Sequence, residues 1–352
     1  MRIAQLETNP EDPAASGERG RAMAGFLRRH GHQVDVISPD PARLLDYTRF
    51  RFSFWSRLKR RTLRRRFLPH LWEYVADELE PRIRRGAYDA VIARAHPLAF
   101  VLTRDLPGMK IVDVANVGFL EHYHSWGSDL AEVERDWEME LAVYRAVDAI
   151  LLPHDILAGF FRRYVFDHPK VMTVRLGADP AEATADWSSS PRIVYAGSYD
   201  YFQDPFLLGM LAKRSPFPIH FYGPRDPNFA FLPGRLDYRG FAATPRFLAD
   251  YQLGLITVSQ DRLRQHSPST KFAYYFAHGL PVLFPSWMKE GFCYEAAIPY
   301  DEDGFAATVS ALGADEQRWR SLSRRATLIA ADLTWERVLA PLLDVLQRRG
   351  TP

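Results

Sequence analysis

The chain has 352 residues, of which 47% are hydrophobic, and its 45 basic and 43 acidic side chains leave a formal net charge of +2. This composition is typical of a globular protein with two hydrophobic cores of ordinary size, and it excludes a disordered or fibrous chain. The near-neutral charge gives no general attraction to nucleic acid. The single cysteine, Cys293, excludes an internal disulfide and a multi-cysteine metal site, and its apolar surroundings predict a place in the core.

The first apolar run, residues 2–6, is too short for a signal peptide and is predicted to be the first strand. No window reaches about 18 uncharged apolar residues, so no membrane-spanning helix is predicted. We therefore expect a cytoplasmic protein.

Strands and helices are predicted to alternate along the first half of the chain. The expected strands are 2–6, 33–38, 89–94, 110–115, 148–152 and 170–174, and the expected helices are 17–30, 41–86, 97–104, 128–147 and 155–163. Such alternation indicates an α/β fold with a doubly wound parallel sheet and helices on both faces.

The loop before the first helix, residues 11–20, contains Gly17 and Gly20, which would let the backbone approach a ligand closely. In that reading Arg19 is a secondary phosphate ligand. A plain capped helix that begins at Ser16 explains the same residues.

Residues 49–66 form a basic aromatic segment with nine arginine and lysine side chains, interleaved with three phenylalanines and Trp55. Such a segment could lie on an anionic bilayer, with arginines at the headgroups and rings at the acyl boundary. The protein would then be peripheral on the inner membrane face. A solvated basic helix that packs its aromatic side inward is the alternative, and nucleic-acid binding is disfavoured because no recognised module surrounds the segment.

The second half has apolar strands whose ends contain glycine. Residues 192–200 end in Gly197 and Ser198, residues 217–224 contain Tyr222 and Gly223, and residues 252–258 form a third apolar run. Glycine lets backbone amides approach a ligand at the carboxyl end of a parallel strand. These strands predict half of a doubly wound nucleotide-binding fold.

The most informative segment is 266–284, where cap-forming residues precede a helix that ends near Gly279 and is followed by a buried strand. Ser267, Ser269 and Thr270 lie at the helix start, where unpaired amides and the helix dipole attract anions. Lys271 adds a full charge in the first turn, and Tyr274 lies one turn further on. We expect this segment to bind a diphosphate, with Tyr274 near the ribose; an ordinary capped core helix is the alternative.

These residues predict two Rossmann-like domains. The first covers residues 1–178, a turn-rich linker covers 179–191, and the second covers 192–333. A capped apolar stripe at 334–352 predicts a closing helix.

The sequence resembles GT-B glycosyltransferases of the family 4 type. The resemblance rests on Gly31, His32 and Val34, on Tyr-Ala-Gly-Ser at 195–198, on Ser-x-x-Lys followed by His-Gly-Leu-Pro-Val at 278–282, and on Thr-Trp-Glu at 334–336. Within that group, the amino-acid sequence of residues 267–281 is similar to that of bacterial xanthan-type glucuronosyltransferases.

This resemblance implies two Rossmann-like domains with a cleft between them and a role in polysaccharide biosynthesis. The donor would be a nucleotide sugar, most simply a UDP-sugar such as UDP-glucuronate, and the acceptor a saccharide or a lipid-diphosphate-linked saccharide. Ser269, Thr270 and Lys271 would contact the donor diphosphate. No Asp-x-Asp metal motif is seen between the domains, so we expect a metal-independent site without a further cofactor.

An inverting enzyme of this type needs a general base in its first half. The candidates follow predicted strands: His96, Asp113, Glu121 and His122. A carboxylate or histidine at a strand's carboxyl end is well placed to take a proton from an acceptor hydroxyl, although each could equally be a cap or a surface residue.

Two hypotheses stay open. The first is a glycosyltransferase. The second is a non-catalytic protein that binds sugar nucleotides or acts as a scaffold, because Val117 and Tyr274 stand where the resembled enzymes carry an aspartate and a glutamate.

Overall fold

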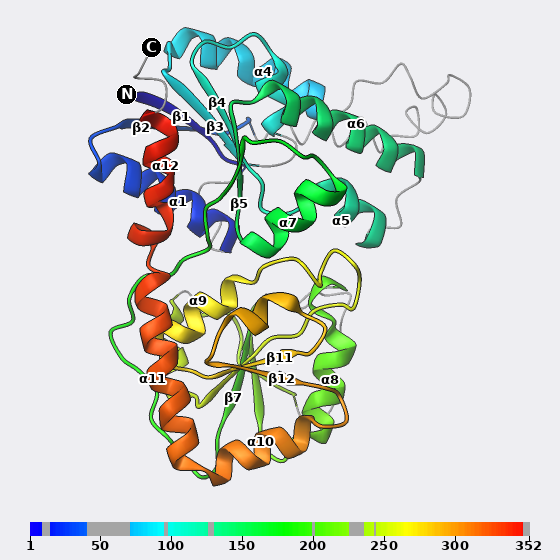
Figure 1. The fold of residues 1–352 in the computed structure, drawn as a ribbon, viewed down its shortest axis with the longest axis vertical. Coiled ribbons are helices and arrows are strands. Elements are labelled where there is room, and N and C mark those ends of the chain that lie inside the picture. The colour runs from blue at the N-terminus through cyan, green and yellow to red at the C-terminus, as the bar shows by residue number, and fades with distance from the viewer. Residues whose placement is uncertain are drawn as a thin grey trace. The chain divides into compact units, whose positions relative to one another are not determined.

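The computed structural model describes residues 1–8, 15–40, 71–94, 98–125, 130–198, 201–224, 236–242 and 244–347. The chain divides into two compact units (Figure 1). The first unit is Met1–Val174 together with Leu339–Pro352, and the second is Arg175–Val338.

The first unit is built on a six-stranded sheet in which all neighbouring strands are parallel. Its strands are β1 (Arg2–Leu6), β2 (Gln33–Ile37), β3 (Ala90–Arg94), β4 (Met109–Asp113), β5 (Ala149–Leu152) and β6 (Val171–Thr173). Their order is β2-β1-β3-β4-β5-β6. The chain therefore changes direction across the sheet between β1 and β3, which is the topological switch point of this unit.

Helices surround this sheet, as expected from the alternating sequence pattern (Figure 1). They are α1 (Ala15–Arg29), α4 (Leu71–Gly86), α5 (Gly118–Ser125), α6 (Leu130–Ala146) and α7 (Asp155–Tyr164), with the 3₁₀ helix η2 (Leu98–Thr103) and the last part of α12 (Trp335–Gln347). Buried apolar side chains of the strands fill the core, and β3 is buried throughout.

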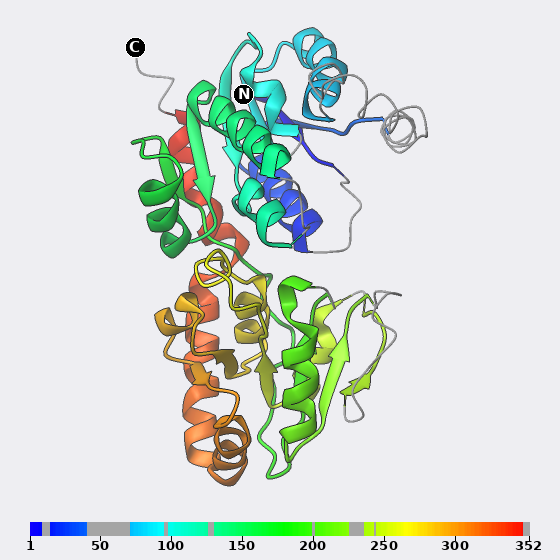
Figure 2. The same ribbon diagram turned by 90° about the vertical axis from the view of Figure 1, so that its right-hand side faces the viewer.

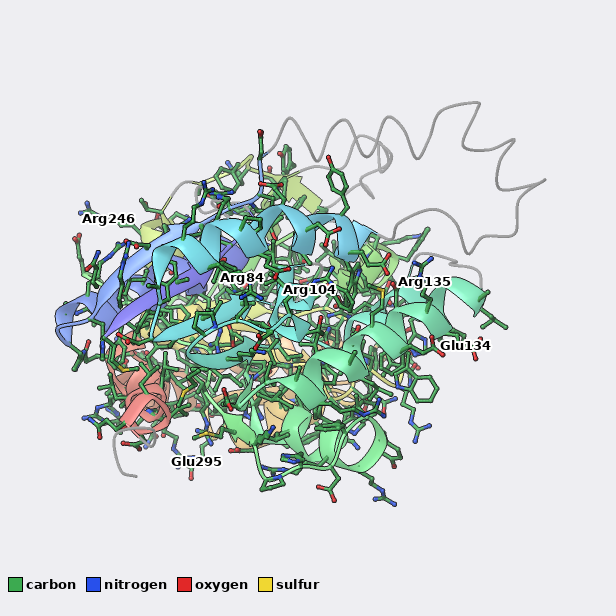
Figure 3. The ribbon with its side chains drawn as sticks, turned by 90° about the horizontal axis from the view of Figure 1, so that it is seen from above. Arg84, Arg104, Glu134, Arg135, Arg246 and Glu295 are labelled. Carbon is green, nitrogen blue, oxygen red and sulfur yellow. The ribbon has the colours of Figure 1, made fainter. Side chains whose placement is uncertain are left out.

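Charged pairs cover the outer surface of α4. Arg84 pairs with Glu80 at 2.9 Å, and Arg104 pairs with Asp77 at 2.6 Å. Figure 3 labels the two arginines beside this helix. The side chains of both pairs are partly exposed to solvent, and such pairs contribute little to stability, about 0 to 1 kcal/mol each.

The second unit has a second six-stranded parallel sheet, in the order β12-β11-β10-β7-β8-β9. Its strands are β7 (Ile193–Ala196), β8 (Ile219–Tyr222), β9 (Leu236–Tyr238), β10 (Leu253–Leu255), β11 (Val282–Pro285) and β12 (Ala297–Tyr300). The first three strands run outward from β7, and the next three begin on its other side. The switch point of this unit therefore lies between β7 and β10, where a doubly wound sheet binds ligands at its carboxyl edge.

Helices lie on both faces of the second sheet. They are α8 (Pro205–Arg214), α9 (Thr270–Ala277), α10 (Phe305–Ala314) and α11 (Glu316–Asp332), with short 3₁₀ helices η3 (Tyr201–Gln203), η4 (Pro245–Asp250) and η5 (Lys289–Cys293). In Figure 1 the strands lie between α9 and α11 on one side and α8 on the other. Figure 2 shows α8 running beside the strands at the β9 edge, with which it is in contact.

The doubly wound α/β class expected from the sequence is confirmed, and the predicted strands differ from the observed ones by a few residues at their ends. The expected helix at 97–104 is a 3₁₀ helix, in which the Thr103 hydroxyl donates to the Phe100 carbonyl. The expectation for Cys293 is wrong, because this residue is exposed at the end of η5.

The stretch expected to be a linker, 179–191, belongs to the second unit. The Ala185 amide donates to the His278 carbonyl, and the Gln252 side chain donates to the Asp186 carbonyl. These bonds fix the stretch on the second unit, although its turn-rich sequence gives it no helix or strand.

Candidate functional site

The carboxyl end of β7 brings a glycine and a lysine together at the switch point of the second sheet. Gly197 follows β7 directly, and Lys271 lies in the first turn of α9. A methyl group at Gly197 would lie 2.6 Å from Cε and 2.9 Å from Nζ of Lys271. Because Gly197 has no side chain, the lysine stem can pass over the backbone here. The sequence predicted both residues for one site, and the structure brings them into contact.

The Lys271 ammonium contacts a tyrosine of β7 and a glutamine of η3, the 3₁₀ helix that follows this strand. Its Nζ donates to Oε1 of Gln203 at 2.7 Å, and it lies 5.3 Å from the centre of the Tyr195 ring. A cation at that distance from an aromatic face is attracted by the ring. The Tyr195 hydroxyl in turn donates to the Ser198 carbonyl at 2.6 Å. The ammonium is thus held at the switch point at a half-buried position.

The first turn of α9 has the geometry expected of an anion-binding helix start. Ser269 is its N-cap, and its hydroxyl accepts a hydrogen bond from the Lys271 amide at 3.3 Å. Thr270 begins the helix and is half-buried. Ser267 is buried, and its hydroxyl donates to the Leu263 carbonyl at 3.0 Å. Ser267 therefore supports the turn before the helix, while Ser269, Thr270 and Lys271 form its start.

A buried acid, Glu290 in η5, supports the same helix start. Its Oε2 accepts a hydrogen bond from the Ser269 amide at 2.6 Å, and its Oε1 accepts one from the Tyr294 hydroxyl at 3.2 Å. Burial raises the pKa of Glu290 to about 8, against the opposing effects of these hydrogen bonds and of the Arg175 charge. At neutral pH this acid is therefore mostly uncharged. A neutral acid leaves the positive potential of the helix start intact for a phosphate.

Tyr275 of α9 is fully buried and joins the helix to both strands of the switch point. Its hydroxyl oxygen accepts a hydrogen bond from the Ala196 amide at 2.9 Å and lies 3.2 Å from the Leu255 carbonyl, to which it can donate. Gly254 makes room for the Tyr275 ring, since a methyl group there would overlap it. Burial raises the pKa of this hydroxyl above the ordinary range, which keeps it a donor.

The end of β8 lies beside the end of β7. The Gly197 amide donates to the Tyr222 carbonyl at 2.9 Å, and the Gly197 carbonyl lies so close to Gly223 that a methyl group there would overlap it. Gly223 also has a φ of 154°, which a residue with a side chain adopts rarely. The Tyr222 ring lies 4.0 Å from the Phe247 ring, and its hydroxyl accepts a hydrogen bond from Tyr251. The structure thus brings the predicted pair Tyr222 and Gly223 to the same edge as Gly197.

Tyr274 is half-buried one turn after Lys271, and its carbonyl accepts from the His278 ring. Its expected contact with a ribose stays a prediction.

Sequence reasoning missed Gln203, Tyr275 and Glu290. A signal for Gln203 was the Asp-Pro pair that follows it, which marks a helix start; Glu290 carries no such signal.

The first sheet has a buried charge cluster at its switch point. Arg19 of α1 donates to both carboxylate oxygens of Asp113, at 2.9 and 2.7 Å, and to the Val174 carbonyl at 3.0 Å. Arg94 lies 3.3 Å from Asp113 and 3.6 Å from Glu7. Burial alone would raise the pKa of Asp113, but the two guanidinium groups override it and lower the pKa.

This geometry changes the expectations for two residues. Arg19 is 1% exposed and Asp113 is 0% exposed. A fully buried carboxylate that is held by two arginines is a poor proton acceptor, because taking a proton would break both ion pairs. Arg19 is likewise occupied by Asp113 and does not offer its guanidinium to a phosphate. The structure therefore assigns this pair to the core of the unit rather than to chemistry.

Glu121 is placed differently, in the first turn of α5. Its carboxylate accepts a hydrogen bond from the Asn116 side chain at 2.5 Å, and it is half-buried. The start of α5 is fixed by Glu140 of α6, whose carboxyl group accepts from the Phe119 amide at 2.6 Å. His122 lies in the same helix, but its side chain and the whole of His96 lie outside the described residues. Glu121 is thus the best-placed described candidate for a base.

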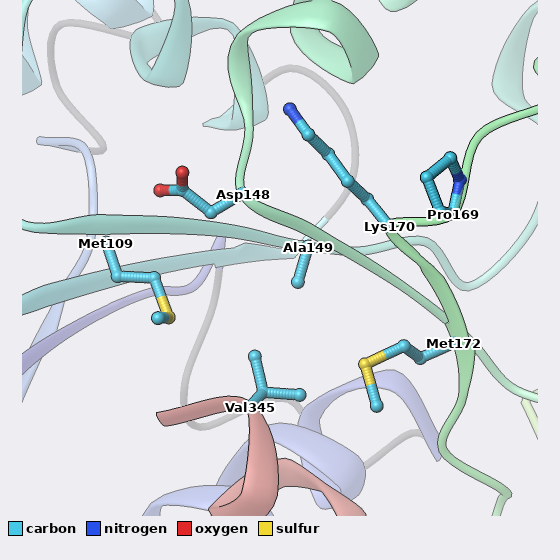
Figure 4. Close-up of a pocket in the computed structure, with 7 residues that line it drawn as sticks. All are labelled: Met109, Asp148, Ala149, Pro169, Lys170, Met172 and Val345. Carbon is cyan, nitrogen blue, oxygen red and sulfur yellow. The ribbon is translucent and has the colours of Figure 1, made fainter. Parts of the chain in front are cut away.

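Two further observations concern other kinds of site. Within the described residues, histidine, cysteine and acidic side chains form no group that could hold a metal ion, and no helix there is long and apolar enough to span a membrane. A small open pocket in the first unit is lined by Met109, Met172 and Val345 among others (Figure 4). Met109 begins β4, so this pocket lies at the amino edge of the sheet, away from the switch point.

The two sheets and their strand orders define the GT-B class of glycosyltransferase fold. Residues 21–182 match the model of Glycosyltransferase Family 4. This match assigns a family 4 domain to the first part of the chain, and similar solved structures give the whole chain the GT-B fold. A comparison with curated protein sequences gives no significant match.

Solved structures share the fold at low sequence identity. Sucrose-phosphate synthase from Thermosynechococcus elongatus is similar with a TM-score of 0.76 and 14% identity over 99% of both chains. HepE of Anabaena, solved in complex with UDP, gives a TM-score of 0.69 and 13% identity over 99% of this chain and 100% of that one. The pneumococcal O-GlcNAc transferase GtfA, solved with UDP and GlcNAc, gives 0.58 and 12% over 81% of this chain and 61% of that one.

Proposed function

We propose that this protein is a glycosyltransferase that transfers a sugar from a UDP-linked donor to a saccharide or lipid-linked acceptor without a metal ion. The observation that supports this proposal most is the position of Lys271, which lies over Gly197 in the first turn of α9 at the switch point of the second sheet. Similar folds solved with UDP, HepE and GtfA among them, make UDP the first nucleotide to test.

The chemistry at this site is stabilisation of the leaving group. When the bond between the sugar and the diphosphate breaks, negative charge grows on the departing UDP. The Lys271 ammonium and the amides at the start of α9 face that charge, and they are held in place before the reaction begins. In this proposal the Ser269 hydroxyl and the amide and hydroxyl of Thr270 lie around the phosphates. Gly197, Ser198, Tyr222 and Gly223 line the edge on which the donor lies.

Glu121 is the proposed general base, with His96 and His122 as alternatives. A base takes the proton from the acceptor hydroxyl as the sugar is transferred. The hydrogen bond from Asn116 orients the Glu121 carboxylate, and Glu140 fixes the helix that carries it. We expect Glu121→Gln to abolish turnover while UDP still binds. If Glu121→Gln, His96→Ala and His122→Ala all kept full activity, none of these three residues would be the general base.

UDP-glucuronate is the proposed donor to test first, on the strength of the resemblance at 267–281. The acceptor is proposed to be lipid-linked because the basic aromatic segment 49–66, which lies outside the described residues, has the composition of a membrane-surface segment. Such a protein would work in the cytoplasm, on the inner face of the membrane. Changing Arg60, Arg61, Arg64 and Arg65 to glutamine should reduce co-sedimentation with anionic vesicles, and unchanged binding would contradict the membrane proposal.

Calorimetric titration tests the donor site directly. The purified protein is titrated with UDP, GDP, ADP and TDP in EDTA, and the titrations are repeated with Lys271→Ala. Lys213→Ala, an exposed lysine in the last turn of α8, is the matched control. We expect selective UDP binding that is weakened at least tenfold in Lys271→Ala and unchanged in the control. Binding of none of the four nucleotides would contradict the proposal.

A second candidate function is a non-catalytic protein that binds sugar nucleotides. Val117 is buried in the loop after β4, at the position where the resembled enzymes carry an acidic base. UDP binding without turnover of any UDP-sugar, in the presence of saccharide and lipid-linked acceptors, would favour this function. Turnover of UDP-glucuronate or another donor would exclude it.

A further inference from the structure

The neutral side chain of Gln203 is a hydrogen-bond partner of the Lys271 ammonium. Oε1 of Gln203 lies 2.7 Å from Nζ of Lys271, although the two residues are 68 positions apart. We propose that Gln203 is a positioning residue of the donor site: it fixes the lysine at the switch point and, because it is uncharged, adds no negative charge beside the diphosphate. This inference rests on the proposed function.

The backbone of Gln203 is anchored across the switch point. Gln203 ends η3, which follows β7, and its carbonyl accepts a hydrogen bond from the Thr257 hydroxyl in the loop after β10. Thr257 is fully buried. This hydrogen bond joins the segment after β7 to the loop after β10. It would have to break for the Gln203 backbone to move away from Lys271.

The next residue, Asp204, fixes the chain direction after Gln203. Asp204 has a left-handed backbone with a φ of 49°, and its carboxylate accepts from the Leu207 amide at 2.9 Å as the N-cap of α8. A non-glycine residue in this conformation persists only where the surrounding contacts hold it. The hydrogen bond from Thr257 and the N-cap of α8 together fix the backbone position of Gln203.

The Lys271 side chain is confined on several sides. The centre of the Tyr195 ring lies 5.3 Å from Nζ of Lys271, and the Gly197 backbone lies against the Lys271 side chain. The Gln203 side chain accepts a hydrogen bond from the Lys271 ammonium. Fixing the rotamer of a long side chain before the ligand arrives reduces the entropy that binding would otherwise cost. Lys271 and Gln203 are both half-buried, so this end of the side chain stays within reach of a ligand.

The charge of the partner matters for a phosphate site. An amide oxygen orients the ammonium by a hydrogen bond but does not neutralise it. A carboxylate in the same place would form an ion pair with Lys271, and a diphosphate would have to compete with that pair and would meet a like charge. Glutamine and glutamate have nearly the same shape, so exchanging them changes the charge and little else.

The test compares Gln203→Glu and Gln203→Ala with the unaltered protein by calorimetric titration with UDP and with uridine in EDTA. We expect Gln203→Glu to weaken UDP binding about tenfold or more while uridine binding is unchanged, because only UDP carries the phosphates. Gln203→Ala should weaken UDP binding by a smaller factor, through loss of positioning alone. In a Lys271→Met background, Gln203→Ala should have no further effect.

The outcomes separate this inference from the proposed function. Absence of UDP binding by the unaltered protein would overturn both. UDP binding that depends on Lys271 but is the same in Gln203→Glu and in the unaltered protein would overturn this inference alone. A thermal denaturation curve for each variant shows that it is folded, and an equal loss of uridine and UDP binding would mean that Gln203 only supports the fold, which also overturns the inference.

Discussion

The hydroxyl oxygen of Tyr275 accepts a hydrogen bond from the backbone amide of Ala196 at 2.9 Å. Ala196 is the last residue of β7, and the same hydroxyl lies 3.2 Å from the Leu255 carbonyl at the end of β10. One phenol therefore links α9 to both strands at the point where they diverge. Because Lys271 lies four residues earlier on this helix, Tyr275 also sets the position of the lysine over Gly197.

Tyr275→Phe should destabilise the protein by about 1 to 3 kcal/mol, because it leaves the half-buried Ala196 amide without this acceptor. Urea denaturation measures the change in the free energy of unfolding. Tyr123→Phe is the matched control, since Tyr123 is 52% exposed and should change stability by less than about 0.5 kcal/mol. Equal midpoints for Tyr275→Phe and the unaltered protein would contradict the prediction.

Gly223→Ala should be among the most damaging single changes at the carboxyl edge of the second sheet. The added methyl group would overlap the Gly197 carbonyl, and the φ of 154° disfavours any side chain. We expect a loss of more than about 2 kcal/mol. Gly240→Ala separates the two causes: its φ is 85°, but no atom lies within 4 Å of an added methyl group, so only the backbone cost of about 1 kcal/mol remains. Thermal denaturation of both variants gives the comparison, and a similar loss in the two would show that the overlap carries no cost.

Asp113→Asn should destabilise the first unit by about 3 to 5 kcal/mol, because it leaves the buried Arg19 without its charged partner. The same measurement on Glu80→Gln, which breaks its partly exposed pairs with Arg84 and Arg104, should give a change below about 1 kcal/mol. UDP affinity of the Asp113→Asn variant, measured where the variant is folded, should stay unchanged. A small stability change with loss of turnover would instead support a catalytic role for Asp113.

The stability of the second unit should fall as the pH rises, in part because of Glu290. Its folded pKa of about 8 lies above the ordinary value of 4.5, so the folded chain keeps a proton that the unfolded chain releases in between. The stabilising contribution is therefore complete below pH 4.5 and is lost as the pH rises to about 8, at about 1.4 kcal/mol for each pH unit.

Glu290→Gln removes this titration but keeps an oxygen that can accept from the Ser269 amide. Urea denaturation at pH 6 and pH 8 should show a loss for the unaltered protein that is about 2 kcal/mol larger than for Glu290→Gln. The exposed Glu316 serves as the control, since Glu316→Gln should leave the pH dependence as it is in the unaltered protein. Parallel pH dependence in Glu290→Gln and the unaltered protein would rule out the buried, protonated acid.

The sequence by itself determined the class of fold and predicted the main parts of the proposed donor site. Alternating strands and helices predict a parallel doubly wound sheet because each element has its own hydrophobic period, and caps and glycines mark the ends of elements. Gly197, Gly223, Ser269 and Lys271 were predicted in this way, since each lies beside a strand end or a helix start that is visible in the sequence.

Only the tertiary structure decided which residues meet. Arg19 and Asp113 are 94 positions apart, and their ion pair gives both residues a role that the sequence did not indicate. Gln203 lies 68 positions from Lys271 and Glu290 lies 21 positions from Ser269. Periodicity and caps depend on neighbours along the chain, whereas these contacts depend on the packing of distant elements at the switch points. That packing also places two arginines beside Asp113, which lower its pKa, and buries Glu290, which raises the pKa of that acid.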